Sequence, residues 1–415
     1  MAEESLSFVM VGHIDHGKST LIGRLLYDTG SLPEGKIQEI EAAARAEGKR
    51  LEYGFIMDHL HEERERGITI DTAQTFFSTA ARDYVIIDAP GHKEFIKNMI
   101  TGASQAEAAV LLCSVAEGVQ EQTKRHAYVI RLLGLEQVTV AYNKMDLVDY
   151  DRERFESVRR DMNDWLERLG VRATMEVPLS AHVGDNVATR SERMPWYEGP
   201  TLVEALDRFR KIPPATRKPL RFPVQDVYEH EGERVAVGRV ESGRLHKDRK
   251  IRFLPGGDVR TVREVLQFMR PDMAEAVAGE CVALRLDGKA PERGQVGCPE
   301  DDQAGMTRRL RASVFWLAPE PLQMDDGAQD LALRCATQET PCRLVELAER
   351  VDSGNLAHLP TDERRLCETE VGEMVIETDS PVVVESFYNV PELGRFVLVK
   401  GRNVVAGGIV THTDG

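Results

Sequence analysis

The chain has 415 residues, of which 42% are hydrophobic and 29% are charged, and its formal net charge is −16. This length suggests two or three domains, each with enough apolar material for its own core. An acidic chain is not expected to hold nucleic acid nonspecifically, although a local basic patch could still do so.

The N-terminus, MAEESLSFVM, lacks the basic stretch and long apolar run of a secretory signal. No run of about twenty apolar residues occurs, so we expect no transmembrane helix, no membrane partner and a cytoplasmic location. The cysteines are scattered and none forms a CxxC pair, which predicts unpaired, buried thiols of a reducing compartment. They are Cys113, Cys281, Cys298, Cys335, Cys342 and Cys367.

The first half of the chain alternates short apolar runs with amphipathic stretches. Strands are predicted at residues 7–12, 85–87, 109–113, 138–142 and 176–179, and helices at 18–28, 121–133 and 152–169. Such alternation is typical of an α/β domain whose mostly parallel sheet carries helices on both faces. We place this domain at residues 1–212.

The second half of the chain has a different rhythm. Four prolines in residues 212–223 exclude a persistent helix and predict a linker. Short strand-like runs with glycine turns follow, interrupted by a polar break near residues 299–305. The predicted strands are 234–240, 250–254, 259–265 and 281–286, then 312–317, 331–335, 371–378, 382–387, 395–399 and 404–410. This pattern predicts two β-barrels, at residues 213–303 and 304–415.

A phosphate-loop pattern, GxxxxGK[ST], lies between the first predicted strand and the first predicted helix. Backbone N–H groups of such a loop wrap a phosphate chain, and the helix directs its positive end at it. Lys18 is expected to reach the β- and γ-phosphates, and Ser19 to ligate Mg²⁺. The predicted nucleotide-binding residues here are Gly12, His13, Ile14, Asp15, His16, Gly17, Lys18, Ser19 and Thr20.

A second motif, DAPGH, begins at Asp88 about seventy residues after the phosphate loop. At the end of a buried strand, Asp88 can hold Mg²⁺ through water. Gly91 can bring a backbone N–H to the γ-phosphate, because no side chain blocks the approach. Thr69, in GITID after a charged run, can close the Mg²⁺ shell when a γ-phosphate is present. That segment is expected to order with the triphosphate and relax after hydrolysis.

The tetrapeptide NKMD, Asn143 to Asp146, follows another buried strand. The Asp146 carboxylate can accept two hydrogen bonds from guanine, and adenine would leave it unpaired. Lys144 would lie along the base plane, and Asn143 would tie the base to the phosphate loop. Ser180, Ala181 and His182, after the strand at 176–179, complete the predicted base site with N–H groups for guanine O6. In this order the motifs predict a GTPase that uses GTP and Mg²⁺.

These motifs carry a family resemblance. GHIDHGKS, ERERGITID, DAPGH and NKMD resemble the translation-factor class of GTPases, and the likeness continues through MPWY, GPTL and the barrels to Gly408. In that class a G domain precedes two β-barrels. The resemblance implies that His92 positions the attacking water and that Ile14 and Ile68 form an apolar gate, so that hydrolysis is slow until a partner triggers it. The expected catalytic residues are Lys18, Thr69, Gly91 and His92.

Two branches of this class fit the sequence. One is the large GTPase subunit of the heterodimeric bacterial sulfate adenylyltransferase, in which GTP hydrolysis assists a smaller nucleotidyltransferase subunit that makes adenylyl sulfate from ATP and sulfate. The other is the elongation factor one alpha and Tu branch, which carries aminoacyl-tRNA to the ribosome.

The features divide between the branches. NKMDLVDY at 143–150, GDNV followed by SERMPWYEGPTL, and the Trp316 strand with its EPL resemble the sulfate subunit. Residues 213–415 also carry about seven more acidic than basic side chains, which argues against binding a polyanion. HKEFIKNM, VESF and PELGRF instead resemble elongation factor one alpha. We expect the sulfate branch, with a nucleotidyltransferase partner and no nucleic acid; translation is the alternative. No second phosphate-loop pattern occurs, so a fused adenylyl-sulfate kinase domain is not expected.

Overall fold

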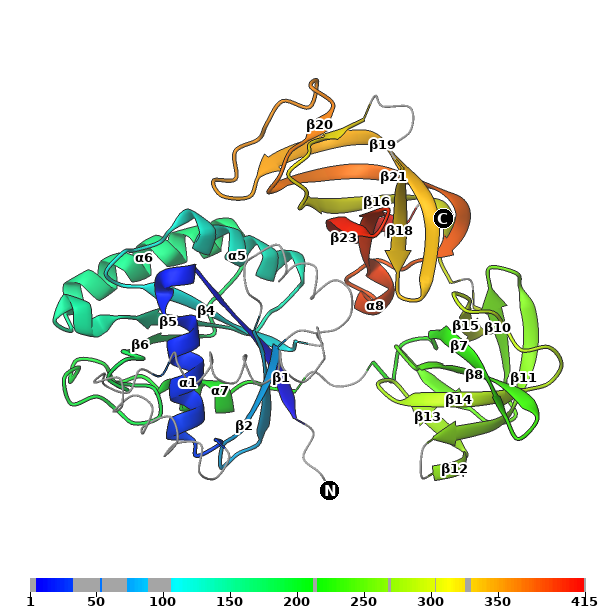
Figure 1. The fold of residues 1–415 in the computed structure, drawn as a ribbon, viewed down its shortest axis with the longest axis horizontal. Coiled ribbons are helices and arrows are strands. Elements are labelled where there is room, and N and C mark those ends of the chain that lie inside the picture. Colours follow the sequence, from blue (N-terminus) through cyan, green and yellow to red (C-terminus); the bar gives the residue numbers. More distant parts are fainter. Residues whose placement is uncertain are drawn as a thin grey trace. The chain divides into compact units, whose positions relative to one another are not determined.

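The computed structural model describes residues 5–32, 53, 73–88, 106–211, 215–267, 270–302, 304–324 and 330–413 (Figure 1). The chain folds as two compact units, one ending at Lys211 and the other beginning at Ile212. The described part of the first unit combines strands with helices, and that of the second consists almost entirely of strands.

The first unit is built on a six-stranded sheet of order β2-β3-β1-β4-β5-β6. Its strands are β1 (Leu6–Gly12), β2 (Ala73–Ser78), β3 (Asp83–Asp88), β4 (Ala108–Ser114), β5 (Val138–Asn143) and β6 (Met175–Pro178). Neighbours are parallel except for the antiparallel β2–β3 hairpin. Every residue of β4 and β5 is buried, as expected for central strands covered on both faces.

Helices cover this sheet. They are α1 (Lys18–Asp28), α5 (Glu121–Leu132), α6 (Arg152–Arg168) and α7 (Leu202–Asp207), with 3₁₀ turns η1 (Ile14–His16) and η2 (Met145–Val148). Side chains of α1 and α7 share one core cluster with Phe8 and Val110. Trp165 of α6 donates its indole N–H to the Lys124 carbonyl of α5 at 3.3 Å. Thr201 begins α7 with a reciprocal capping box to Glu204, which satisfies two N–H groups of its first turn.

The second unit begins with a β-barrel. Its strands are β7 (Phe222–His230), β8 (Glu233–Arg239), β9 (Arg244–His246), β10 (Lys250–Leu254), β11 (Asp258–Gln267), β12 (Arg270–Met273), β13 (Glu275–Val277), β14 (Cys281–Leu286) and β15 (Val296–Pro299). Seven of them form one sheet that pairing of β10 with β11 closes on itself. Alternate residues of β14, such as Val282 and Leu284, lie in its core.

A second barrel follows, closed in the order β16-β21-β19-β18-β22-β23. The elements of this part are β16 (Met306–Trp316), β17 (Leu322–Gln323), β18 (Leu331–Cys335), β19 (Gln338–Asp352), β20 (Arg365–Leu366), β21 (Glu370–Val383), α8 (Pro391–Gly394), β22 (Arg395–Lys400) and β23 (Asn403–Thr413). An α/β domain with a mostly parallel sheet, followed by two β-barrels, confirms the predicted fold class.

A buried arginine joins the two barrels. Arg221, only 4% exposed, donates Nε–H and Nη2–H to Glu385 Oε1 at 2.8 and 2.6 Å, and it also pairs with Asp302. Two carboxylates therefore compensate one desolvated guanidinium, and removing both of them would leave an unpaired buried charge.

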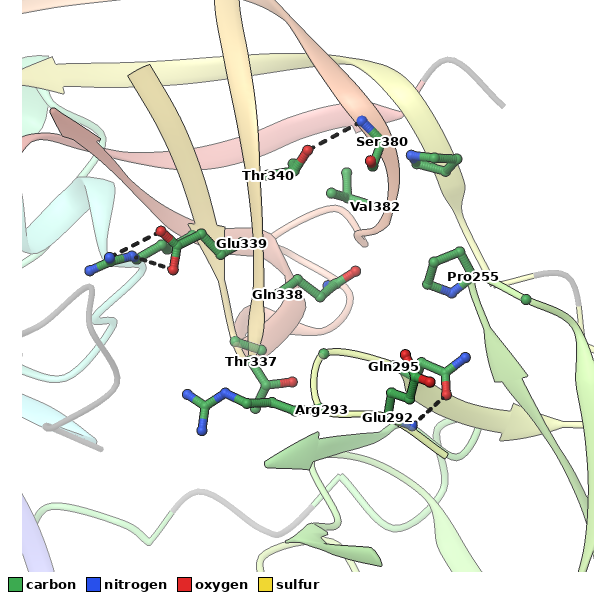
Figure 2. A pocket seen from close by; sticks show the side chains of 15 residues that line it. Pro255, Glu292, Arg293, Gln295, Thr337, Gln338, Glu339, Thr340, Ser380 and Val382 are labelled. Carbon is green, nitrogen blue, oxygen red and sulfur yellow. Dashed lines mark hydrogen bonds and ion pairs between the residues drawn. The ribbon is translucent and has the colours of Figure 1, made fainter. Parts of the chain in front are cut away.

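A cavity of about 830 Å³ also lies between the barrels (Figure 2). Polar residues that line the cavity form hydrogen bonds with one another: Ser380 N–H donates to Thr340 Oγ1 at 3.2 Å, and Glu292 N–H donates to Gln295 Oε1 at 2.7 Å. Among the described residues that line this cavity, none belongs to the predicted nucleotide site.

Four details differ from the sequence predictions. β21 runs unbroken through Val383, so no separate strand begins at residue 382, and the long strand β19 was not predicted. The predicted linker ends in strand β7, which contains Pro223. All six cysteines are unpaired, but Cys281 is exposed and Cys367 is half-buried, so the expectation of buried thiols is wrong for these two. In the described part of the chain, no helix combines the length and hydropathy needed to cross a membrane.

Candidate functional site

The phosphate loop occupies the turn between β1 and α1. Gly17 has φ +86°, and a Cβ at this position would lie 2.6 Å from Asn143 Nδ2. Only glycine therefore fits the turn. Gly17 is also the N-cap of α1, and no side chain caps this helix end. The first-turn N–H groups are thus available to an anion, which the positive end of the helix dipole would favour.

The first turn of α1 also suits a metal-bound phosphate. Ser19 is exposed there, so its hydroxyl can reach a cation beside the phosphates. Lys18, the first residue of α1, follows Gly17 directly, and its side chain interacts with other residues of the folded chain. The site therefore fits a nucleoside triphosphate with Mg²⁺. It combines a turn that only glycine can adopt, an uncapped helix end and an exposed hydroxyl.

Asn143 connects the phosphate loop to the base-reading loops. Its side chain is 3% exposed, donates from Nδ2 to the His16 carbonyl at 2.8 Å, and accepts the Ala181 N–H at Oδ1 at 2.9 Å. The amide nitrogen and the amide oxygen of Asn143 therefore both form hydrogen bonds within the protein. In this structure the Ala181 N–H, predicted to bind guanine O6, is directed to Asn143 instead.

The Asp146 carboxylate lies in η2 and faces the loop after β6. Its Oδ1 accepts the Ser180 hydroxyl at 2.6 Å, and Ser180 Oγ accepts the Val183 N–H at 3.2 Å. Arg24 of α1 holds the same loop by donating Nη1–H to the Val183 carbonyl at 2.9 Å. The predicted base-reading residues thus lie together on a cross-linked pair of loops.

Lys144 sits in the left-handed conformation with φ +67°. Its Nζ donates to Glu117 Oε1 at 2.8 Å, and the other oxygen of Glu117 lies 3.9 Å from His16 Nε2. The Lys144 hydrogen bond is the largest cause of a lowered Glu117 pKa. Burial lowers the pKa of His16, whose Nδ1 lies 3.2 Å from the Leu112 carbonyl.

All these loops leave the carboxyl ends of parallel strands, the edge at which open α/β sheets bind ligands. Asp88 is the last residue of β3 and pairs with Met10 of the adjacent β1. Thr69, Gly91 and His92 lie outside the described residues, as do Ile68 and the side chains of Ile14 and Asp88.

Two residues of the site, Glu117 and Arg24, belong to none of the sequence motifs. Glu117 lies three residues beyond β4, at the same sheet edge as the recognised motifs. This position after a buried strand was the sequence feature that could have marked it as a site residue. Arg24 lies within a regular helix, where spacing alone does not mark a contact with a loop far along the chain.

Comparison with known proteins identifies matching families and relatives over the whole chain. Residues 3–212 match the family described as Elongation factor Tu GTP binding domain, and residues 309–411 match GTP-eEF1A C-terminal domain-like. Elongation factor 1-alpha of Pyrococcus woesei is 38% identical, covering 99% of this chain and 98% of its own. The same-named protein of Methanosphaerula palustris is 36% identical, covering 97% and 96%. A crystal structure of Sup35 with GDP covers 100% of this chain and 95% of that chain, at 23% identity and a TM-score of 0.46.

The chain therefore belongs to the translation-factor class of GTPases, and it binds and hydrolyses GTP with Mg²⁺. Within that class it belongs to the family of elongation factors Tu and 1-alpha, since the matches span both its first domain and its last barrel.

Two predictions are wrong. The expected role in sulfate adenylyltransferase, and with it the nucleotidyltransferase partner and the exclusion of nucleic acid, is overturned by full-length relatives named elongation factor 1-alpha. The misleading motifs were short, and several lie in the GTP-binding domain that both branches share. The acidic excess of the barrels counted charges without their positions, and a local patch decides whether a polyanion binds.

Proposed function

We propose that this chain is an elongation factor 1-alpha-like translational GTPase, which in its GTP form carries aminoacyl-tRNA to the ribosome in the cytoplasm. The observation that carries the proposal is full-length similarity, 36% and 38% identity to two proteins named elongation factor 1-alpha, with both barrels included.

The nucleotide site would divide its work among a few residues. The first turn of α1, with Lys18, would bind the phosphates, and Asp146 would accept hydrogen bonds from guanine. Mg²⁺, held by Ser19 and Thr69 and through water by Asp88, would neutralise charge on the phosphates. The internal bonds of Asn143 support this division, because they join the phosphate loop at His16 to the base loop at Ala181.

Hydrolysis would depend on positioning. His92 would orient the attacking water, Gly91 would direct its N–H at the γ-phosphate, and Ile14 with Ile68 would hold His92 back until a partner triggers the switch. Phosphoryl transfer needs mainly alignment and charge stabilisation, so one misplaced side chain is enough to keep unaided turnover slow.

The base assignment can be tested with Asp146→Asn. An amide presents a donor where the carboxylate presents an acceptor, so GDP affinity should fall at least about a hundredfold while xanthosine diphosphate binds better. Equilibrium titration with both nucleotides measures this change. Unchanged GDP affinity in the variant would refute the role of Asp146.

Delivery of aminoacyl-tRNA is tested with the full chain loaded with GTP or GDP. The GTP form should protect the aminoacyl ester from spontaneous hydrolysis, and the GDP form should protect it at least about tenfold less, since the two states differ in affinity. Uncharged tRNA serves as the competitor. Equal protection in both nucleotide states, or equal competition by uncharged tRNA, would contradict the proposal.

A further inference from the structure

Glu117 is a carboxylate placed between the two halves of the nucleotide site. Its Oε1 accepts the Lys144 ammonium of the base-reading motif at 2.8 Å. Its Oε2 faces Nε2 of His16, at 3.9 Å, in the phosphate loop. One side chain therefore contacts both loops, and it belongs to neither motif.

The turn that carries Glu117 is held rigidly. Glu117 N–H donates to Ser114 Oγ at 3.3 Å, and the Gln120 side chain donates to the Glu117 carbonyl at 2.9 Å. Arg154 of α6 donates Nε–H to the Val115 carbonyl and Nη2–H to the Ala116 carbonyl, both at 3.0 Å. These contacts fix the backbone of the turn, and the Glu117 carboxylate interacts with Lys144, with the Ser114 side chain and with His16.

The backbone conformation and the partial burial of Lys144 both bear on its pairing with Glu117. Its backbone is left-handed, a conformation that costs roughly 1 kcal/mol or more for a residue with a Cβ. Its side chain is 24% exposed, so the ammonium is partly desolvated when it meets Glu117. An anchored tip restricts the long aliphatic stem to one direction, which lowers the entropy lost when a base packs against it.

His16 gives the carboxylate its second contact. The imidazole is 0% exposed, Nδ1 faces the Leu112 carbonyl, and Nε2 makes no hydrogen bond although it is buried. Among the residues that the structure describes, the charged or titratable groups that act on this ring are Glu117, His13 and Lys144. Glu117 is the anion among them and balances the Lys144 ammonium, whereas burial lowers the pKa of the imidazole and favours its neutral form.

We propose that Glu117 is a positioning residue for guanine nucleotides: it holds Lys144 against the base and thereby sets the lifetime of the bound nucleotide. The proposal rests on the placement of guanine beside Lys144 argued above. It assigns Glu117 no contact with the nucleotide, so its effect is transmitted through Lys144.

The test measures release of fluorescent GDP and GTP from the full chain by displacement with excess unlabelled nucleotide. Glu117→Ala should release both nucleotides about fivefold faster, the size expected for a partly exposed ion pair. The factor should be the same for GDP and GTP, because the base is common to both. Glu117→Gln keeps an acceptor for Lys144 without the charge, so its release rate should fall between those of wild type and Glu117→Ala.

Controls separate positioning from a general loss of stability. Glu121→Gln is the matched control, since Glu121 lies on the same segment, is 64% exposed and pairs with Arg125; release should stay at the wild-type rate. In a Lys144→Met background, Glu117→Ala should add little further acceleration. Melting of the nucleotide-free Glu117→Gln variant should match wild type.

Two outcomes would overturn the inference: wild-type release rates in Glu117→Ala, or undiminished acceleration by Glu117→Ala in the Lys144→Met background. Either result could coexist with normal discrimination of guanine by Asp146, and it would then leave the proposed base site intact. Loss of guanine discrimination in the Asp146 experiment would instead remove the base placement on which the inference rests.

Discussion

Gly17 is required for two reasons, its backbone conformation and the space beside it. The turn from β1 into α1 needs a positive φ, and the Asn143 amide occupies the space where a Cβ would project. The same amide connects His16 and Ala181, so a displaced Asn143 disturbs the phosphate and base loops together.

Gly17→Ala should therefore lower GTP affinity at least about tenfold, because a left-handed alanine is strained and Asn143 must move. Isothermal titration with GTP and Mg²⁺ measures the loss. Gly30→Ala is the matched control: Gly30 also has a positive φ, +65°, but a Cβ added there would have no neighbour within 4 Å. It should cost stability and leave affinity unchanged. Equal losses from both variants would show that backbone strain alone, without Asn143, explains the effect.

At this scale the sequence predicts residues that stand in motifs. Lys18, Ser19 and Asp146 follow strands at fixed spacing, so their positions at one sheet edge could be inferred. Its position after β4 could have marked Glu117, but its partners could not be inferred, because His16 and Lys144 meet it only after the sheet brings β1, β4 and β5 side by side. The hydrogen bond from the Ala181 N–H to Asn143 could not be predicted either, because every residue except proline has a backbone N–H and the sequence does not show where it is directed.

Secondary-structure elements show where pattern and fold diverge. The predicted helix at 18–28 coincides with α1, and the predicted strand at 250–254 with β10, because each has an unambiguous hydrophobic period. Strand β19 was missed although its first seven residues alternate between buried and exposed. Its LVELAER segment has apolar residues at helical spacing, and pairing with β18 and β21 overrides that local preference.

The junction between the barrels contains a carboxyl group that titrates near neutrality. Burial, and then the charge of Glu392, raise the pKa of Glu241 from 4.5 to about 7. The folded state therefore binds the proton more tightly than the unfolded state. Stability from this residue is complete below pH 4.5 and is lost as the pH rises through about 7, on the order of 3 kcal/mol in total.

Glu241→Gln should remove this dependence and raise the melting temperature at pH 8 by several degrees relative to wild type. Thermal melts of the full chain between pH 5 and pH 8 measure the difference. Glu229→Gln, an exposed position on β7, is the control and should leave the pH profile unchanged. Parallel profiles for wild type and Glu241→Gln would contradict the assignment.

Charge is distributed unevenly over the whole molecule. Residues 213–303 carry 16 basic and 16 acidic side chains, whereas residues 304–415 carry 11 basic and 18 acidic ones. The acidic excess of the barrels thus belongs to the last one. Exposed charges act over about 10 Å at ordinary ionic strength, so such totals cannot decide whether a polyanion binds at a particular surface.

If the chain carries aminoacyl-tRNA, affinity should fall about tenfold or more between roughly 50 and 200 mM KCl, since phosphate contacts release counterions. Fluorescence titration of labelled aminoacyl-tRNA against the GTP form measures the slope. GTP affinity in the same buffers provides the reference and should change less. A flat salt response would exclude phosphate contacts as the main source of tRNA affinity.

The closed strand order of the last barrel has a consequence for how the protein is made. β16 pairs with β21 on one side and with β23 on the other, although β23 comes at residues 403–413. During synthesis β16 therefore keeps an unsatisfied edge until β23 has left the ribosome, whereas the strands of the first barrel are all present much earlier. The nascent chain must keep that edge from pairing elsewhere while it waits for the strand that completes the ring.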